Sequence, residues 1–155
     1  MNIPNFLNLA TELETEISRL YEQIADASGD PPIGARLKSI ANEEINHANT
    51  IRSGLKYFEG LPDLFAGATM DESELRTGLE EIRRFRRSLA SGKVRLLDNL
   101  QKLLEFEKRY ERVHISASMK ITDPGLKQLF AGLAKGDQSH IENLKILIES
   151  LGGGA

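Results

Sequence analysis

Four stretches of the sequence repeat apolar residues at alternating steps of three and four, and this periodicity constrains the fold more than any other feature. They cover about residues 4–27, 34–58, 93–120 and 124–151. Such steps return to one face of an α-helix, so each stretch predicts a long helix with one buried face. No stretch shows the alternation that marks a strand. We therefore expect an all-α fold, organised as a single domain over residues 1–155.

The links between the predicted helices differ in length. Residues 28–33 and 121–123 form short links, whereas residues 59–92 form a long one. Short links join antiparallel neighbours, and a long link can cross a bundle from one end to the other. The order short, long, short predicts a ferritin-like four-helix bundle with a long crossover between its second and third helices. Asp123, followed by proline, predicts the start of the fourth helix.

The crossover is itself expected to contain a short helix, from about Asp71 to Ser91. Asp71 and Glu74 have the spacing of a capping box, which marks the N-terminus of a helix. Residues 83–87 then carry a dense basic run. Because two glutamates precede this run, we interpret it as a solvated helix face rather than as a phosphate-binding patch.

Each predicted apolar face carries one carboxylate near its middle: Glu14, Glu44, Glu107 or Asp137. Carboxylates in a core lose their hydration and repel one another, and each uncompensated charge costs several kcal/mol. No lysine or arginine lies on the same faces. Bound cations are therefore the natural compensation.

The spacing of these carboxylates is duplicated. In each half of the sequence a carboxylate is followed by a second one 30 residues later, and by a histidine three residues after that. The two trios are Glu14, Glu44 and His47, and Glu107, Asp137 and His140. One offset of 93 residues maps the first trio onto the second, together with several flanking apolar positions. This pattern indicates two copies of one helix pair, related by a pseudo-twofold axis.

The residue types and their spacing fit a metal site. A carboxylate and a histidine at i and i+3 lie on one face of a helix. Two such pairs, with a lone carboxylate from each of two other helices, are the ligand set of di-iron and di-manganese bundle proteins. The alternative is a set of surface salt bridges, which the duplicated spacing disfavours. We predict two metal ions, with iron favoured over manganese, bound by Glu14, Glu44, His47, Glu107, Asp137 and His140.

Two further polar residues lie on the same helix faces. Tyr21 and His114 follow Glu14 and Glu107, respectively, by seven residues, which is two helical turns. We predict that both hydrogen-bond to ligand carboxylates; the alternative is core filling, which we favour for Tyr110. Seven other glutamates are expected to face solvent: Glu12, Glu16, Glu22, Glu43, Glu105, Glu111 and Glu142.

On these residues the chain resembles the rubrerythrin branch of the ferritin-like superfamily over nearly its full length. The resemblance rests on Glu14 with Tyr21, on residues 44–47, on Glu107 and on the His140 pair. It implies a bridged di-iron site and an oxidoreductase that reduces peroxide or dioxygen while oxidising Fe(II). A non-catalytic iron-binding or iron-handling module and a helical interaction domain stay open as alternatives.

The chain departs from the rubrerythrin pattern in three respects. It has no cysteine, so it lacks the rubredoxin iron domain and would need a separate electron donor. Leu104 stands where rubrerythrins tend to carry an additional carboxylate. Asp137 replaces the usual glutamate and is one methylene shorter. We therefore expect two unequal metal positions, with weaker binding beside Asp137 and His140.

Composition narrows the range of partners and the location. The net charge is −3 and no basic face stands out, so nucleic acid is not expected as a partner. No run of about 18 apolar residues occurs, so no membrane span is expected. The absence of cysteine and of a secretory leader pattern predicts a cytoplasmic protein. A homodimer is left open as the oligomeric state.

Overall fold

The computed structural model describes residues 3–60, 71–92 and 94–153. These residues form helices and no strand: α1 (Ile3–Ala27), α2 (Pro31–Glu59), α3 (Ser73–Ser91), α4 (Leu96–Lys120) and α5 (Pro124–Ser150). The prediction of an all-α fold is therefore confirmed. Residues 61–70, which belong to the predicted crossover, lie outside the described residues.

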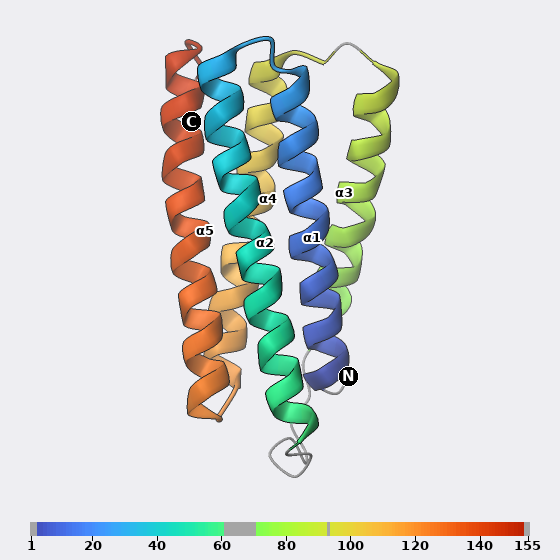
Figure 1. Ribbon diagram of the computed structural model, residues 1–155, viewed down its shortest axis with the longest axis vertical. Coiled ribbons are helices and arrows are strands. Elements are labelled where there is room, and N and C mark those ends of the chain that lie inside the picture. The colour runs from blue at the N-terminus through green and yellow to red at the C-terminus, as the bar shows by residue number, and fades with distance from the viewer. Residues whose placement is uncertain (1–2, 61–70, 93, 154–155) are drawn as a thin grey trace.

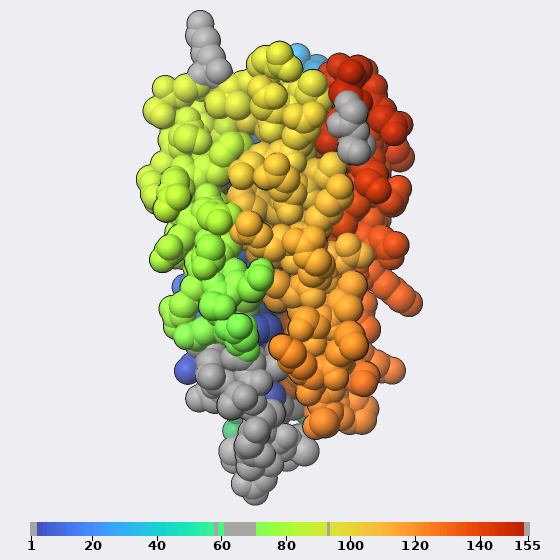
Figure 2. Space-filling model, turned by 180° about the vertical axis from the view of Figure 1, so that it is seen from behind, coloured from blue at the N-terminus to red at the C-terminus, as the bar shows by residue number. Residues whose placement is uncertain are grey.

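The helices run along the longest axis of the molecule (Figure 1). α1 packs along α2, and α4 packs along α5, so each short link joins two antiparallel neighbours. The two pairs meet where α2 touches α5 and where α1 touches α4. α3 lies against α1. Figure 2, which views the molecule from behind, shows α3 beside α4. A site in the core between the two pairs therefore receives side chains from α1, α2, α4 and α5.

α3 is a packed helix rather than a solvated connector. It buries Leu75, Leu79 and Ile82 on one face. Phe85, within the basic run, packs against Phe106 of α4 with ring centroids 6.3 Å apart. Tyr110 crosses close to Gly78, where a Cβ atom would overlap its hydroxyl group. The absence of a side chain at this position lets α3 and α4 approach each other.

A buried ionic contact fastens α3 to α1 and corrects one prediction. Glu16, expected to face solvent, is buried. Its carboxylate accepts hydrogen bonds from Arg19 at 2.9 Å and from Arg86 at 2.5 Å. Gln23 donates to the backbone carbonyl of Arg86 at 2.9 Å. The prediction for Glu16 was wrong because α3 covers this side of α1, and Arg86 is not a freely solvated member of its run.

The helix starts test two capping predictions with opposite outcomes. Asp123 caps α5 as expected, because its carboxylate accepts the backbone N–H of Leu126 at 3.0 Å. The capping box predicted for Asp71 and Glu74 is wrong. Asp71 instead accepts the backbone N–H and the hydroxyl of Ser73 at 2.9 and 2.7 Å. A short aspartate side chain reaches the backbone two residues on, and α3 begins only at Ser73.

The apolar faces predicted from the periodicity form the core, where leucine, isoleucine and aromatic side chains from the helices are buried together. The end of the last predicted stretch, residues 124–151, is an exception. Leu151 is 37% exposed, because α5 ends at Ser150 and the chain then leaves the buried face. Among the described helices, none combines the length and the apolar character that crossing a bilayer requires.

Candidate metal centre

The eight polar residues singled out in the sequence lie together in the middle of the molecule. Four helices contribute two residues each: Glu14 and Tyr21 from α1, Glu44 and His47 from α2, Glu107 and His114 from α4, and Asp137 and His140 from α5. All are buried except His47, whose side chain is 16% exposed. They converge because each lies on the apolar face of its helix, and those faces form the core.

Two groups of side chains have the spacing that a metal ion needs. In the first, Glu14, Glu44 and His47 each offer a ligand atom, and these atoms lie within 4.8 Å of one another. In the second, Glu44, Asp137 and His140 do the same. Glu44 belongs to both groups, so its carboxylate lies where it can bridge two ions.

Glu44 directs one oxygen towards each of the paired histidines. Its Oε2 lies 3.1 Å from Nδ1 of His47, and its Oε1 lies 2.8 Å from Nδ1 of His140. Glu107 approaches the same nitrogen of His140 with its Oε1 at 3.5 Å. Glu107 therefore reaches the cluster through His140 and belongs to neither group of three.

Tyr21 and His114 contact the carboxylates across the core. The hydroxyl of Tyr21 donates to Oε1 of Glu107 at 2.6 Å. Nδ1 of His114 donates to Oδ2 of Asp137 at 2.5 Å, and its Nε2 lies 3.2 Å from Oε1 of Glu14. Each of these residues thus holds a carboxylate that belongs to the predicted ligand set.

Several polar atoms in the cluster lack a hydrogen bond within the described protein. They are buried, and they are Oε1 of Glu14, Oε1 of Glu44, Nε2 of His114 and Nδ1 of His140. They form two close pairs instead: Oε1 of Glu44 lies 2.8 Å from Nδ1 of His140, and Oε1 of Glu14 lies 3.2 Å from Nε2 of His114. Each pair brings a carboxylate and an imidazole together in the core, where ionic attraction replaces part of the lost hydration. Carboxylate oxygen and imidazole nitrogen are also ligand atoms that suit iron or manganese.

Glu43 contacts His140, and the sequence did not predict this contact. It was expected to face solvent, and its side chain is 51% exposed, yet its Oε2 lies 2.7 Å from Nε2 of His140. A carboxylate on the outer nitrogen fixes the tautomer of a histidine and directs the inner nitrogen towards a metal. The only signal in the sequence was the position of Glu43 directly before Glu44. The identity of its partner depended on the neighbouring helix.

Burial of the carboxylates shifts their proton affinities upwards. Burial and, next, the charge of Glu44 raise the pKa of Glu14 to about 7. Burial and the charge of Glu107 raise the pKa of Glu44 to about 8. Burial also raises the pKa of Asp137 to about 6, against the opposing effect of His114. Glu107 differs: burial would raise its pKa, but hydrogen bonding and charge from His140 and other neighbours bring it below its usual value.

The histidines supply positive charge to the same cluster. Burial would lower the pKa of His140, but Glu107 and Glu44 raise it to about 12. Burial likewise opposes protonation of His114, but Asp137 and Glu14 raise its pKa well above the ordinary value. The cluster therefore has protons and imidazolium groups available as compensation, in addition to the bound cations expected from the sequence. A metal ion that bound here would displace these protons.

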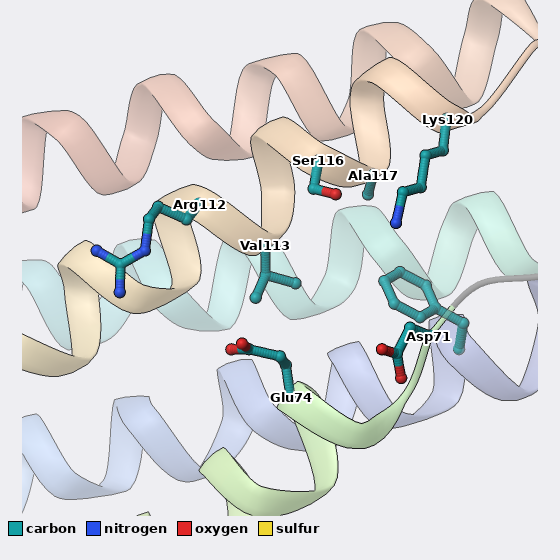
Figure 3. A pocket seen from close by; sticks show the side chains of 8 residues that line it. Asp71, Glu74, Arg112, Val113, Ser116, Ala117 and Lys120 are labelled. Carbon is teal, nitrogen blue, oxygen red and sulfur yellow. The ribbon is translucent and has the colours of Figure 1, made fainter.

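A separate pocket opens between the start of α3 and the end of α4 (Figure 3). It has a volume of about 360 Å³ and contains none of the predicted site residues. Asp71 and Glu74 lie on one side, and Arg112 and Lys120 extend from α4 on the other. The candidate metal centre is thus distinct from this pocket.

Comparison with known proteins gives no relative for this chain: no protein-family model, curated protein or solved structure matches it.

Proposed function

We propose that the protein is a ferritin-like, two-metal carboxylate protein of the rubrerythrin type. In this proposal α1, α2, α4 and α5 are the four helices of the bundle, and α3 belongs to the long crossover between the second and third of them. The packing of α1 on α2 and of α4 on α5 supports this arrangement. The convergence of four carboxylates and two paired histidines on one buried cluster supports the metal site.

The two groups of ligand atoms suggest how the ions are shared. Glu14, Glu44 and His47 would hold one ion, and Glu44, Asp137 and His140 would hold the other, with Glu107 beside His140. Oxygen and imidazole ligands suit iron or manganese, and the resemblance to rubrerythrins favours iron. Bound iron would supply the two electrons that reduce peroxide or dioxygen.

The surrounding residues have positioning roles in this proposal. Tyr21 restrains Glu107 through a hydrogen bond of 2.6 Å. Glu43 holds the outer nitrogen of His140, which keeps Nδ1 directed inwards. His114 holds Asp137 and lies against Glu14, so it restrains one carboxylate from each helix pair. The electron donor that would restore Fe(II) is a separate molecule.

The observation that carries the proposal is that Glu44 belongs to both groups of buried ligand atoms, one with Glu14 and His47 and the other with Asp137 and His140. Anaerobic loading with Fe(II), followed by stopped-flow mixing with hydrogen peroxide, tests it. We expect two Fe(II) per chain, and oxidation of both by one peroxide, which takes up two protons and leaves two molecules of water. Glu44→Gln is the control for iron free in solution. Failure of the protein to bind Fe(II) would refute the proposal.

A non-catalytic iron carrier is the second candidate. The observation that favours it is the partial exposure of His47, which would let an ion leave for a partner. The same experiment separates the two: fast oxidation by peroxide or dioxygen supports the oxidoreductase. Binding of two Fe(II) with oxidation no faster than in solution supports the carrier.

A further inference from the structure

The two paired histidines differ in what lies against their outer nitrogen atoms. Nε2 of His140 contacts Glu43 at 2.7 Å, and the His140 side chain has no exposed surface. The His47 ring lies over the backbone of Gly136 in α5. A Cβ atom at Gly136 would be 2.5 Å from Nε2 and 2.6 Å from Cε1 of this ring. His47 is therefore accommodated by a missing side chain, whereas His140 is held by a carboxylate.

Glu43 and Gly136 occupy equivalent positions in the internal repeat. They are separated by the same offset of 93 residues as the two trios, and each directly precedes a ligand carboxylate, Glu44 or Asp137. The repeat thus provides a carboxylate at this position in one half and no side chain in the other. The histidine that lies against the missing side chain, His47 of the other half, is the one that reaches the surface, since its side chain is 16% exposed.

We infer that Gly136 positions His47, and that metal ions and a small oxidant reach the buried carboxylates past the exposed edge of the His47 ring. The inference rests on the proposed two-metal function. A real side chain at residue 136 would overlap the ring at 2.5 Å and displace Nδ1 from Glu44 and Glu14. The other seven cluster residues are buried, so of these residues only His47 joins the cluster to solvent.

The positioning role of Gly136 is tested with Gly136→Ala and a matched control, Gly132→Ala. Gly132 lies one turn earlier on α5 and is exposed, and a Cβ atom there would meet nothing within 4 Å. Both changes replace a helical glycine by alanine, but only the first overlaps His47. Circular dichroism establishes that the metal-depleted variants fold, and titration with Co(II) follows the number, affinity and absorption spectrum of bound ions.

We expect wild type and Gly132→Ala to bind two Co(II) with the same spectrum. Gly136→Ala should lose one ion, or bind it about tenfold more weakly, with altered absorption bands that report the displaced imidazole. Two unchanged ions in Gly136→Ala would overturn the inference and leave the proposed function intact. A wild-type protein that binds no Co(II) would instead refute the proposed function.

Access past His47 is tested with a second variant that leaves the His47 ring in place. This test also applies if Gly136→Ala does not fold. The chain contains no cysteine, so Gly132→Cys introduces a single thiol one helical turn from Gly136, to which a bulky maleimide can be attached. Ser91→Cys, at the exposed end of α3, is the control. Restricted access slows association, so we expect the modified Gly132→Cys protein to take up Co(II) about tenfold more slowly, with the same final amount. Equal rates of Co(II) uptake in the two modified proteins would overturn the inference that ions enter past His47.

Discussion

The helix pair α1–α2 and the helix pair α4–α5 contribute equivalent residues to the candidate centre but hold them differently. Tyr21 and His114 are equivalent in the repeat, yet Tyr21 donates one hydrogen bond to Glu107, whereas His114 carries charge to Asp137 and Glu14. Glu43 faces His140, whereas Gly136 faces His47. A repeated ligand pattern thus sets where the ligands meet, and the residues that are not repeated set the charge, restraint and exposure of each half.

The largest expected effect comes from Glu44, which both halves share. Glu44→Gln keeps the shape of the side chain but removes the charge and one ligand oxygen. We expect the affinity for both ions to fall by about a hundredfold or more, because each group of ligand atoms includes this carboxylate. Glu142→Gln makes the same chemical change on an exposed side chain of α5. Co(II) titration measures both variants, and loss of only one ion would contradict a shared carboxylate.

The next largest effect should be the pH dependence of stability, to which raised pKa values in both halves contribute. In α1–α2 the pKa values of Glu14 and Glu44 rise from 4.5 to about 7 and about 8, so between these limits the folded state binds more protons than the unfolded state. The free energy of unfolding of metal-depleted protein should therefore fall as pH increases from about 4.5 to 8. The contribution of Glu14 alone is of the order of 3 kcal/mol.

Thermal unfolding at pH 5 and pH 8 with a chelator measures this effect. We expect the higher melting temperature at pH 5, and a smaller difference in Glu14→Gln than in the surface variant Glu142→Gln. Saturating metal should raise the melting temperature most at pH 8, because there fewer protons must be displaced. A metal-depleted protein that is more stable at pH 8 would contradict the upward shifts.

A smaller effect is expected at Glu43, whose equivalent in the other half, Gly136, has no side chain. Glu43→Gln should weaken binding of the ion at His140 about tenfold, because an amide orients the imidazole less strongly than a carboxylate. The ion at His47 should keep its affinity. Glu22→Gln, on an exposed residue of α1, is a suitable control. Equal weakening of both ions would show that Glu43 acts on the fold rather than on His140.

The smallest effect is expected at Asp137. Its shorter side chain is also drawn towards His114 at 2.5 Å, so both features reduce its reach to an ion. Asp137→Glu should tighten the position beside His140 severalfold and bring the two affinities closer together. Stepwise Co(II) titration decides the matter. Two indistinguishable affinities in the unmodified protein, or weaker binding in Asp137→Glu, would refute the expected inequality.

The sequence by itself determined the helices and the residues that meet in the core. Steps of three and four convert directly into one face of a helix, so the periodicity was sufficient to predict where Glu14, Glu44, Glu107 and Asp137 would point. The duplicated spacing then predicted that both helix pairs contribute their carboxylates to one cluster. Local geometry was enough for these conclusions because each concerns a residue and its own helix axis.

Only the tertiary structure decided which side chains lie against that set. Arg86 covers Glu16 from 70 residues away, and His140 contacts Glu43 from 97 residues away. His47 fits over Gly136 on another helix. These pairs depend on the register and separation of neighbouring helices, which arise from packing of whole faces and have no counterpart in local spacing. Which residues share one face of a helix is therefore predictable from the sequence. The charge balance of the centre, and the side on which it is exposed, depend on how the helices pack together.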